Sequence, residues 1–495
     1  MNGKKSQIVT SIVLCLVFLV SPSLIFSQQS DNISEDVAFS LEPGWFHAPV
    51  KESAGQTAKN YLIGSLGMVT VNVLMRDWNQ FVGGAGWAQV TLKEVWKPWE
   101  REVEFDTDWH WTNFIGHTYQ GSLYYMSARN ANLNVFTSLV MSSLGSAMWE
   151  YFCELNDPSI NDLVYTGIGG FFMGEMLYRL ALEANTVSPI LGTIINPLRL
   201  ISDPLLNRPP VGPVGNLHEL SFKAGIGAAV TGTWFSRDFD FAQEVFPGSF
   251  GLEFYAVYGD PYGHDSNVPL SQFEWEMGAG IGAGSGFGEN DMEKKMMYDV
   301  HIFSNGLLFS RSPQWGNNTD TSVGIVFDYD YIRHSFVELS SMALGFGVKQ
   351  RVNGHHHRLE WQFHLDGIFL GTSDFYYFRR SLLPVLDNGT VRDYGYTVGA
   401  ETVAKLRWFA GERHILNTDF HGYAMYKFPF QKQKNDDTGW ELIGVVDTSY
   451  EFALTRQILL GISDELYLKK TLYDTKPDLF SLLNTTSFYV RLQVR

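Results

Sequence analysis

The chain is poor in cysteine and has no excess of positive charge. Its 495 residues contain two cysteines, Cys15 and Cys153, which excludes a disulfide-rich scaffold and a zinc module built on cysteine ligands. Lysine and arginine total 36 against 53 aspartates and glutamates, so the formal net charge is −17. A protein that binds duplex DNA or RNA needs a basic surface. We therefore expect no nucleic-acid partner.

Long apolar runs are scarce after the amino terminus. The best later candidate for a membrane helix, residues 135–149, is interrupted by serines and is shorter than the roughly 20 apolar residues that cross a bilayer. Aromatic residues, by contrast, make up 15% of the chain, and there are 47 glycines at a mean hydropathy of −0.08. This composition fits an outer-membrane β-barrel better than a helical membrane protein or an average cytosolic enzyme.

The amino terminus has the three parts of a secretory signal peptide. Lys4 and Lys5 form a basic start, residues 8–20 are apolar, and the small residue Ser27 precedes the expected cleavage point. A membrane anchor is the alternative for this segment. Cleavage would leave Cys153 as a lone thiol, which cannot form an internal disulfide in an oxidising compartment.

Hydrophobic periodicity divides the rest of the chain into two parts. The apolar residues recur at helical spacing up to about residue 186, and at every second residue from about residue 216. A proline-rich stretch lies between the two parts. We therefore predict an α+β chain with a signal peptide at 1–27, a flexible segment at 28–57, a helical domain at 58–186, a proline-rich linker at 187–215 and an antiparallel outer-membrane β-barrel of about twelve strands at 216–495.

The predicted strands alternate between apolar and polar residues. The clearest alternation spans 356–370, where Trp361 and Phe363 would face lipid while Glu360 and Gln362 face the lumen. A soluble β-sandwich alternates too, but tight connections after the sixth, eighth and tenth strands favour a barrel. The strands are expected near 216–232, 246–258, 271–284, 295–311, 321–331, 336–352, 356–370, 394–408, 413–429, 440–454, 458–470 and 484–495.

The inward positions of these strands are crowded with ionisable residues. A network of paired side chains that fills a small barrel is one explanation, and we favour it over a polar conduit with an acidic bias. The inward set is Glu274, Glu276, Asp299, His301, Asp328, Asp330, Arg358, Glu360, His364, Asp366, Glu401, Lys405, Arg407, Asp419, His421, Asp447 and Glu451.

The helical part contains a potential cluster of three ionisable residues. Its helices are expected near 58–82, 87–103, 111–130, 133–154 and 158–185, the last with Asp157 as N-cap and Pro158 at its first position. The last three are joined by two or three residues, so neighbours should run antiparallel. His117 lies early in one helix, Glu150 late in the next and Asp162 early in the third. We therefore expect these side chains to meet at one end of the bundle.

The order of motifs in this region resembles the bacterial family called domain of unknown function 3943. The resemblance covers residues 75–185 and rests on His117-x-x-x-Gly121, Ala128-Arg129, Trp149-Glu150, Pro158-Ser159-x-Asn161-Asp162 and Gly169-Gly170-x-x-x-Gly174-Glu175. The resemblance implies an exported protein that is associated with the outer membrane. It implies no particular activity, because the family has none assigned.

Three functions are compatible with these features. In the first, the helices plug or dock on the barrel, and buried polar side chains fix their packing. The polar candidates are His117, Glu150, Asp162, Arg129, Asn161, Glu175 and Arg179, and the glycines that allow close packing are Gly121, Gly169, Gly170 and Gly174. We favour this structural role, or one in envelope maintenance or transport, and we expect outer-membrane lipid and the barrel assembly machinery as partners.

The second function is an enzyme that modifies envelope lipid or glycan. His117 would act as general base, and Glu150 or Asp162 would orient it or bind a metal. The chain lacks G-x-S-x-G, H-E-x-x-H, phosphate-loop and Rossmann motifs, so we expect neither a resident metal nor a cofactor. The third function is a narrow pore, which bilayer conductance would detect. No substrate or small-molecule ligand follows from the sequence.

Overall fold

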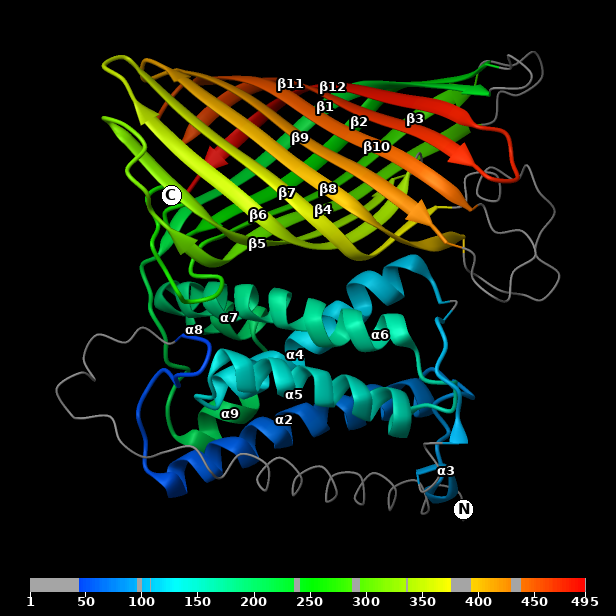
Figure 1. Cartoon of the computed structure of the whole chain (residues 1–495), viewed down its shortest axis with the longest axis vertical. Coiled ribbons are helices and arrows are strands. Elements are labelled where there is room, and N and C mark those ends of the chain that lie inside the picture. Colours follow the sequence, from blue (N-terminus) through cyan, green and yellow to red (C-terminus); the bar gives the residue numbers. More distant parts are fainter. Residues whose placement is uncertain are drawn as a thin grey trace. The chain divides into compact units, whose positions relative to one another are not determined.

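A computed structural model describes residues 44–95, 100–106, 108–235, 241–286, 294–334, 337–374, 393–428 and 438–494. The chain divides into a unit that ends at Gly215, whose described part is helical, and a barrel unit that begins at Asn216 (Figure 1). The predicted fold class, a helical part followed by an antiparallel barrel of twelve strands, is confirmed. The predicted signal peptide lies outside the described residues.

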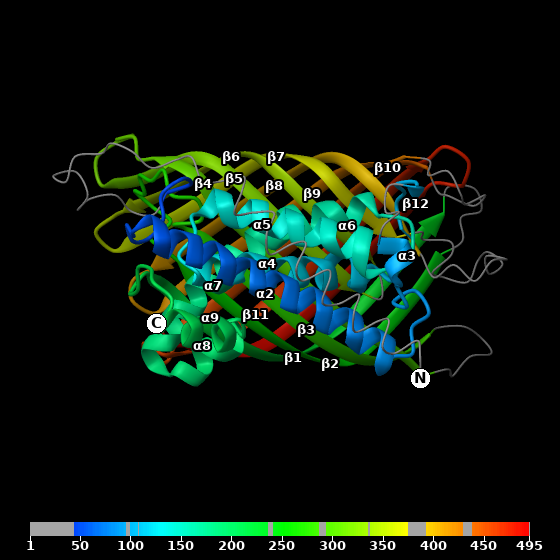
Figure 2. The same cartoon turned by 90° about the horizontal axis from the view of Figure 1, so that it is seen from below.

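The helical unit is built around one central helix, α4 (His117–Asn130), which packs against three others. Its neighbours are α2 (Ala54–Phe81), α5 (Val135–Met148) and α7 (Gly170–Val187), and α2 crosses the unit diagonally in Figure 2. Shorter elements complete the unit: α3 (Leu92–Val95), α6 (Ile160–Val164), α8 (Pro189–Ile195), α9 (Arg199–Leu206) and three π-helical turns, η3 (Thr112–Gly116), η4 (Trp149–Cys153) and η5 (Tyr165–Gly169). Among the described residues, no helix is both long and apolar enough to cross a membrane.

Two local predictions for the helical unit were wrong. The N-cap before α6 is Ser159, whose hydroxyl accepts a hydrogen bond from the Asp162 N–H at 3.3 Å, and it is not Asp157. The proline-rich stretch contains α8 and α9 instead of being a plain linker. Pro189 stands at the start of α8, where a missing N–H costs nothing, and the Ser188 hydroxyl caps the same helix. Pro189 therefore helps to define the start of α8.

Twelve antiparallel strands close into the barrel, and β1 (Leu217–Phe235) pairs with β12 (Leu479–Gln493). The last strand begins earlier than its sequence pattern indicated. Leu482 and Leu483 interrupt the alternation there, but the ladders to β1 and β11 still extend to this end of the strand. The other strands are β2 (Phe241–Tyr258), β3 (Phe273–Gly286), β4 (Lys294–Arg311), β5 (Thr319–His334), β6 (Glu338–Asn353), β7 (His357–Asp374), β8 (Tyr394–Ala410), β9 (His414–Lys427), β10 (Gly439–Ala453) and β11 (Ile458–Tyr473).

The barrel is apolar outside and polar inside. On β7, Phe363 and Leu365 are 45% and 59% exposed, whereas Gln362, His364 and Asp366 are buried. The predicted register of this strand is therefore confirmed. Exposed apolar side chains occur around the wall, including Phe222, Ile226, Leu252, Ile281, Val300, Phe346, Leu442, Leu460, Ile462 and Phe488. This pattern is the reverse of a soluble protein and is typical of a barrel surrounded by lipid.

Candidate functional site

His117, Glu150 and Asp162 come together inside the helical unit, as the up-down-up order of the helices predicted. Each side chain offers one potential ligand atom, and the three atoms lie within 4.8 Å of one another. The His117 Nε2 atom is 3.7 Å from Asp162 Oδ1. All three residues are buried. The short connections between helices were thus enough to predict this cluster.

Each member of this cluster is close to a π-helical turn. The turn η3 ends immediately before His117, η4 contains Glu150, and η5 begins three residues after Asp162. A π-helical turn has i→i+5 hydrogen bonds, so it changes the direction of the side chains that follow it. Such turns frequently occur at functional sites. The helical periodicity of the sequence contained no sign of them.

Hydrogen bonds hold the carboxylates of the cluster in place. The Ser159 N–H donates to Glu150 Oε2 at 2.8 Å, and the Asn161 amide donates to Asp162 Oδ1 at 2.8 Å. The same amide also donates to Asp106 Oδ1 at 3.2 Å. Asn161 therefore links Asp162 to a further carboxylate, which the sequence argument had not included in the site.

The electrostatics of the cluster favour neutral side chains. Burial raises the pKa of Glu150, Asp162 and Asp106 well above their ordinary values, and the charges of neighbouring carboxylates add to this effect. Burial also lowers the pKa of His117, although nearby acids oppose the change. The His117 Nδ1 atom lies 3.2 Å from the Thr166 hydroxyl, which orients the ring. A neutral, oriented imidazole has a free lone pair for a proton or a cation.

Arg129, which we considered as a member of this cluster, belongs to a separate network. Its guanidinium donates to Glu175 at 2.8 and 3.2 Å, Arg179 pairs with the same carboxylate at 2.9 Å, and the Tyr125 hydroxyl donates to it at 2.8 Å. His117 and Arg129 are twelve residues apart on α4, about 18 Å along the helix axis. Burial raises the pKa of Glu175, but the two arginines outweigh this and hold it below its ordinary value.

The glycines singled out for packing lie at close helix crossings. A Cβ atom on Gly121 would be 1.8 Å from the Thr166 carbonyl oxygen, and one on Gly170 would be 2.5 Å from the backbone of Gly121. A Cβ on Gly174 would be 2.8 Å from the Tyr125 side chain. Gly169 is buried in η5. Close approach at Gly121 and Gly170 brings α4 and η5 together next to the His117 cluster.

The barrel interior holds a second cluster, which was not predicted. Its first group is Asp328 with His364 and Asp366, and its second is Asp330 with Glu401 and His421. Within each group the potential ligand atoms lie within 4.8 Å of one another. All six residues had been placed on inward positions, but alternation says only which face a residue occupies. The pairing that brings Asp366 opposite Glu401 depends on strand register.

Charged side chains also cross the barrel lumen. Arg407 on β8 binds Glu219 on β1 through two hydrogen bonds of 2.8 and 3.2 Å. Glu274 on β3 forms ion pairs with Lys349 of β6 at 2.9 Å and with Lys405 of β8 at 3.3 Å. None of these strands are neighbours in the barrel, so each bond joins separate parts of the wall. A cavity of about 130 Å³ in the barrel is lined by residues that include Lys223, Glu276 and His421, and it is far smaller than the about 300–1,000 Å³ of typical ligand pockets.

Comparison with known proteins finds a family model that matches part of the helical unit. Residues 102–197 match the model of the Domain of unknown function (DUF3943). This part of the chain is similar to that family. The match confirms the resemblance found from the motifs. A comparison with curated proteins gave no match.

The barrel is similar to solved outer-membrane barrels at low sequence identity. The COG4313 outer membrane channel from Pseudomonas putida F1 is 9% identical, with a TM-score of 0.32 and coverage of 57% of this chain and 99% of that one. The P. putida toluene transporter TodX is 8% identical, with a TM-score of 0.22 and coverage of 56% and 90%. The NanC porin is 10% identical, with a TM-score of 0.25 and coverage of 54% and 98%.

Proposed function

We propose that this protein spans the outer membrane of a Gram-negative bacterium and has an envelope-maintenance role in which the barrel is not an open pore. A closed barrel leaves no strand edge unpaired, which is the condition for crossing a bilayer with strands. Its apolar exterior supports lipid as the surrounding partner, and insertion of such a barrel would require the barrel assembly machinery.

The connections between strands support a periplasmic DUF3943 domain. The turns after β6, β8 and β10 span only three or four residues, at 354–356, 411–413 and 454–457. Short turns in bacterial barrels face the periplasm. The strands alternate in direction, so β1 starts at the end of the barrel where these turns lie. The helical unit precedes β1 and would therefore be on the periplasmic side.

The observation that carries this proposal is the set of charged bridges across the lumen. The bidentate contact between Arg407 and Glu219 joins β8 to β1, and the Lys405–Glu274 pair joins β8 to β3. Buried charges that lose a partner are costly, so these bridges resist opening. A lumen crossed in this way does not offer a continuous aqueous path for solutes of sugar or lipid size.

Conductance of the full chain in planar bilayers tests this proposal. We expect no stable single-channel steps from the wild type, and steps from a variant with Arg407→Ala and Glu219→Ala, which removes one bridge without leaving a lone charge. Arg358→Ala is the matched control, because this β7 arginine is 45% exposed, its ion pair with Glu360 stays on its own strand, and its guanidinium lies over Phe409 on the neighbouring strand β8 instead of crossing the lumen. Its conductance should equal that of the wild type. Porin-like steps from the wild type would instead establish the narrow-pore alternative.

A second candidate function is modification of envelope lipid or glycan by the DUF3943 domain. The convergence of His117 with Glu150 and Asp162 favours it, because an imidazole that burial keeps neutral can accept a proton from a substrate. Mass spectrometry of outer-membrane lipids and glycans from cells that carry His117→Gln or Asp162→Asn provides the test. Normal barrel assembly with a changed product profile in both variants would support catalysis. Reduced assembly with an unchanged profile would support the structural role.

A further inference from the structure

The six-residue cluster in the barrel contains buried ligand atoms without hydrogen-bond partners. Among the described residues, none donates to either carboxylate oxygen of Asp366, to Asp328 Oδ2 or to Glu401 Oε1, and His364 Nε2 also has no partner. These four residues are at most 3% exposed. A buried carboxylate without a donor or a counter-charge is strongly destabilising. These carboxylate oxygens therefore lack a positively charged or proton-donating partner among the described residues.

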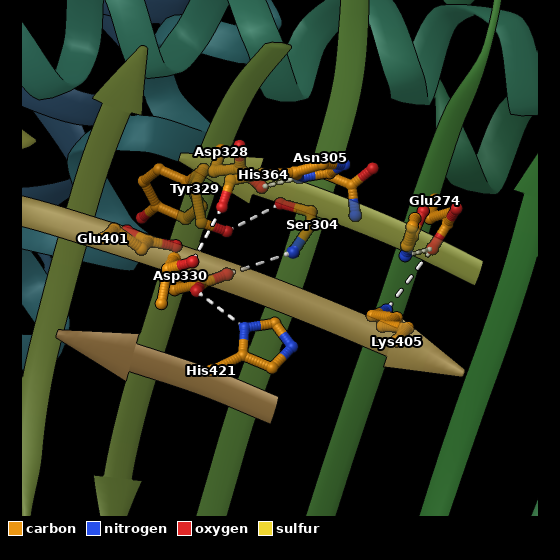
Figure 3. A network of polar contacts seen from close by, with 12 residues as sticks. Glu274, Ser304, Asn305, Asp328, Tyr329, Asp330, His364, Glu401, Lys405 and His421 are labelled. Carbon is orange, nitrogen blue, oxygen red and sulfur yellow. Dashed lines mark hydrogen bonds and ion pairs between the residues drawn. The ribbon is translucent and has the colours of Figure 1, made fainter. Parts of the chain in front are cut away.

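Nearby basic and hydroxyl groups are already engaged. The ammonium group of Lys349 donates three hydrogen bonds, to Gln272, Glu274 and Asn305, which uses all of its protons. In the second group, the Tyr423 hydroxyl donates to Asp330 at 2.6 Å. The close-up in Figure 3 shows Asp330 and Glu401 beside each other, with His421 facing Asp330 at 3.3 Å. The carboxylate oxygens that still lack a hydrogen-bond donor thus belong to Asp328, Asp366 and Glu401.

The barrel wall leaves space for these side chains. Gly345 and Gly347 on β6 stand opposite Asp366 and His364 on β7. A Cβ atom on Gly345 would be 2.4 Å from Asp366 Oδ1, and one on Gly347 would be 2.8 Å from the His364 ring. Any other residue at these two positions would displace the cluster. The wall is therefore shaped around the two side chains.

We propose that the cluster binds divalent transition-metal ions, with one site at Asp328, His364 and Asp366 and a second at Asp330, Glu401 and His421. Ligands about 2.1 Å from a cation lie about 3–4.2 Å from one another, which is compatible with atoms that all lie within 4.8 Å. Imidazole and carboxylate together suit Mn²⁺, Fe²⁺ and Zn²⁺, whereas Mg²⁺ and Ca²⁺ prefer oxygen ligands alone.

The second group also has a route to solvent within the lumen. His421 lines the cavity of about 130 Å³, together with acidic residues such as Glu276 and Asp447. Acidic walls raise the local concentration of cations. A hydrated divalent ion in this cavity would be in contact with His421, whereas Asp366 does not line the cavity. This proposal concerns the barrel alone and does not depend on the role of the DUF3943 domain.

Metal binding by the full chain in detergent tests the proposal. After treatment with EDTA, the protein is titrated with Mn²⁺ alone and, separately, with Zn²⁺ alone, by calorimetry and elemental analysis of the dialysed sample. We expect one to two ions per chain and a higher melting temperature in their presence. Mg²⁺ at the same concentration should bind at least tenfold more weakly. Absence of saturable Mn²⁺ and Zn²⁺ binding in the wild type would overturn the proposal.

Variants distinguish a metal site from carboxylic acids that share protons. The double variant Asp366→Asn with Glu401→Gln keeps the side-chain volumes, and we expect its affinity for Zn²⁺ to fall at least tenfold. Asp260→Asn is the matched control, because this acid pairs with Arg351 at an exposed position away from the cluster and the cavity, and the affinity of this variant should be unchanged. Folding of each variant is checked by heat-modifiable gel migration. If Zn²⁺ binds the folded double variant as tightly as the wild type, the ion is not at this cluster and the proposal is wrong.

Discussion

Glu175 and Arg179 are one helical turn apart and form an ion pair of 2.9 Å, whereas Glu219 and Arg407 are 188 residues apart and meet across the barrel lumen at 2.8 Å. The helical unit thus pairs part of its buried charge through local spacing. The barrel pairs its charge through closure of the sheet. An ion pair within one helix can therefore be recognised in the sequence, whereas the ion pairs across the barrel form only when all twelve strands are in register.

The largest effect is expected where the helical network loses the acid that two of its arginines share. Glu175→Gln would remove the carboxylate that pairs with both Arg129 and Arg179, and we expect the helical unit to lose about 3–5 kcal/mol of stability. Urea unfolding of the full chain, followed by tryptophan fluorescence, measures this. Asp203→Asn is the control, because the Asp203 carboxylate is partly exposed and Arg199 keeps its hydrogen bond to Asn185, so the loss should be smaller. Similar losses in both variants would remove the distinction between the fully buried and the partly exposed acid.

The next effect is a difference between substitutions on the outer face and on the lumen face of the barrel wall. Arginine in place of Phe363 should cost about 2–4 kcal/mol if the residue lies near the bilayer midplane, because the outer face contacts lipid. Phe363→Leu should be tolerated. Gln362→Leu should destabilise the barrel, since Gln362 donates a hydrogen bond to Glu274 in the lumen. Folding titrations into lipid vesicles measure all three, and equal tolerance of leucine at both positions would contradict the register.

A smaller effect tests the helix crossing beside the His117 cluster. Gly121→Ala would place a methyl group 1.8 Å from the Thr166 carbonyl oxygen, and we expect a loss of about 1–3 kcal/mol. Gly167→Ala is the matched control, because the nearest atoms to its Cβ would be those of Ser143, at 3.2 Å or more. The control should be neutral or slightly stabilising, since alanine favours helix. The same urea titration compares the two, and a neutral Gly121→Ala would show that the crossing is not tight.

The smallest effect is a difference in pH dependence between the two helical networks. The pKa of Asp162 is raised in the folded state, so the folded state binds this proton more tightly than the unfolded state does. The contribution of Asp162 to stability is therefore complete below its pKa in the unfolded state, near 4, and is lost as pH rises through its pKa in the folded state. The lowered pKa of Glu175 has the opposite sign, and its contribution is lost as pH falls through the folded value. Asp162→Asn should therefore flatten the decline of stability above about pH 4, by at most about 1.4 kcal/mol per pH unit. Stability curves that are parallel for wild type and variant would contradict this assignment.

Several features of the site were predictable because they depend on neighbours in the chain. The meeting of His117, Glu150 and Asp162 follows from helices joined by short connections. The Glu175–Arg179 pair follows from i,i+4 spacing. By contrast, the separation of Arg129 from the His117 cluster was not predicted, because a guanidinium at the far end of α4 binds Glu175 on α7, which is distant in sequence. The π-helical turns also had no sequence signal.

The sequence by itself determined that a helical part precedes twelve alternating strands, and which side chains of β7 face outward. These properties depend on periodicities of 3.6 and 2 residues, which are local and survive any change in the rest of the fold. Only the tertiary structure decided that Arg407 binds Glu219 and that Asp366 lies beside Asp328. Those contacts depend on the tilt and stagger that close the barrel, since closure sets which residues of distant strands stand at the same height.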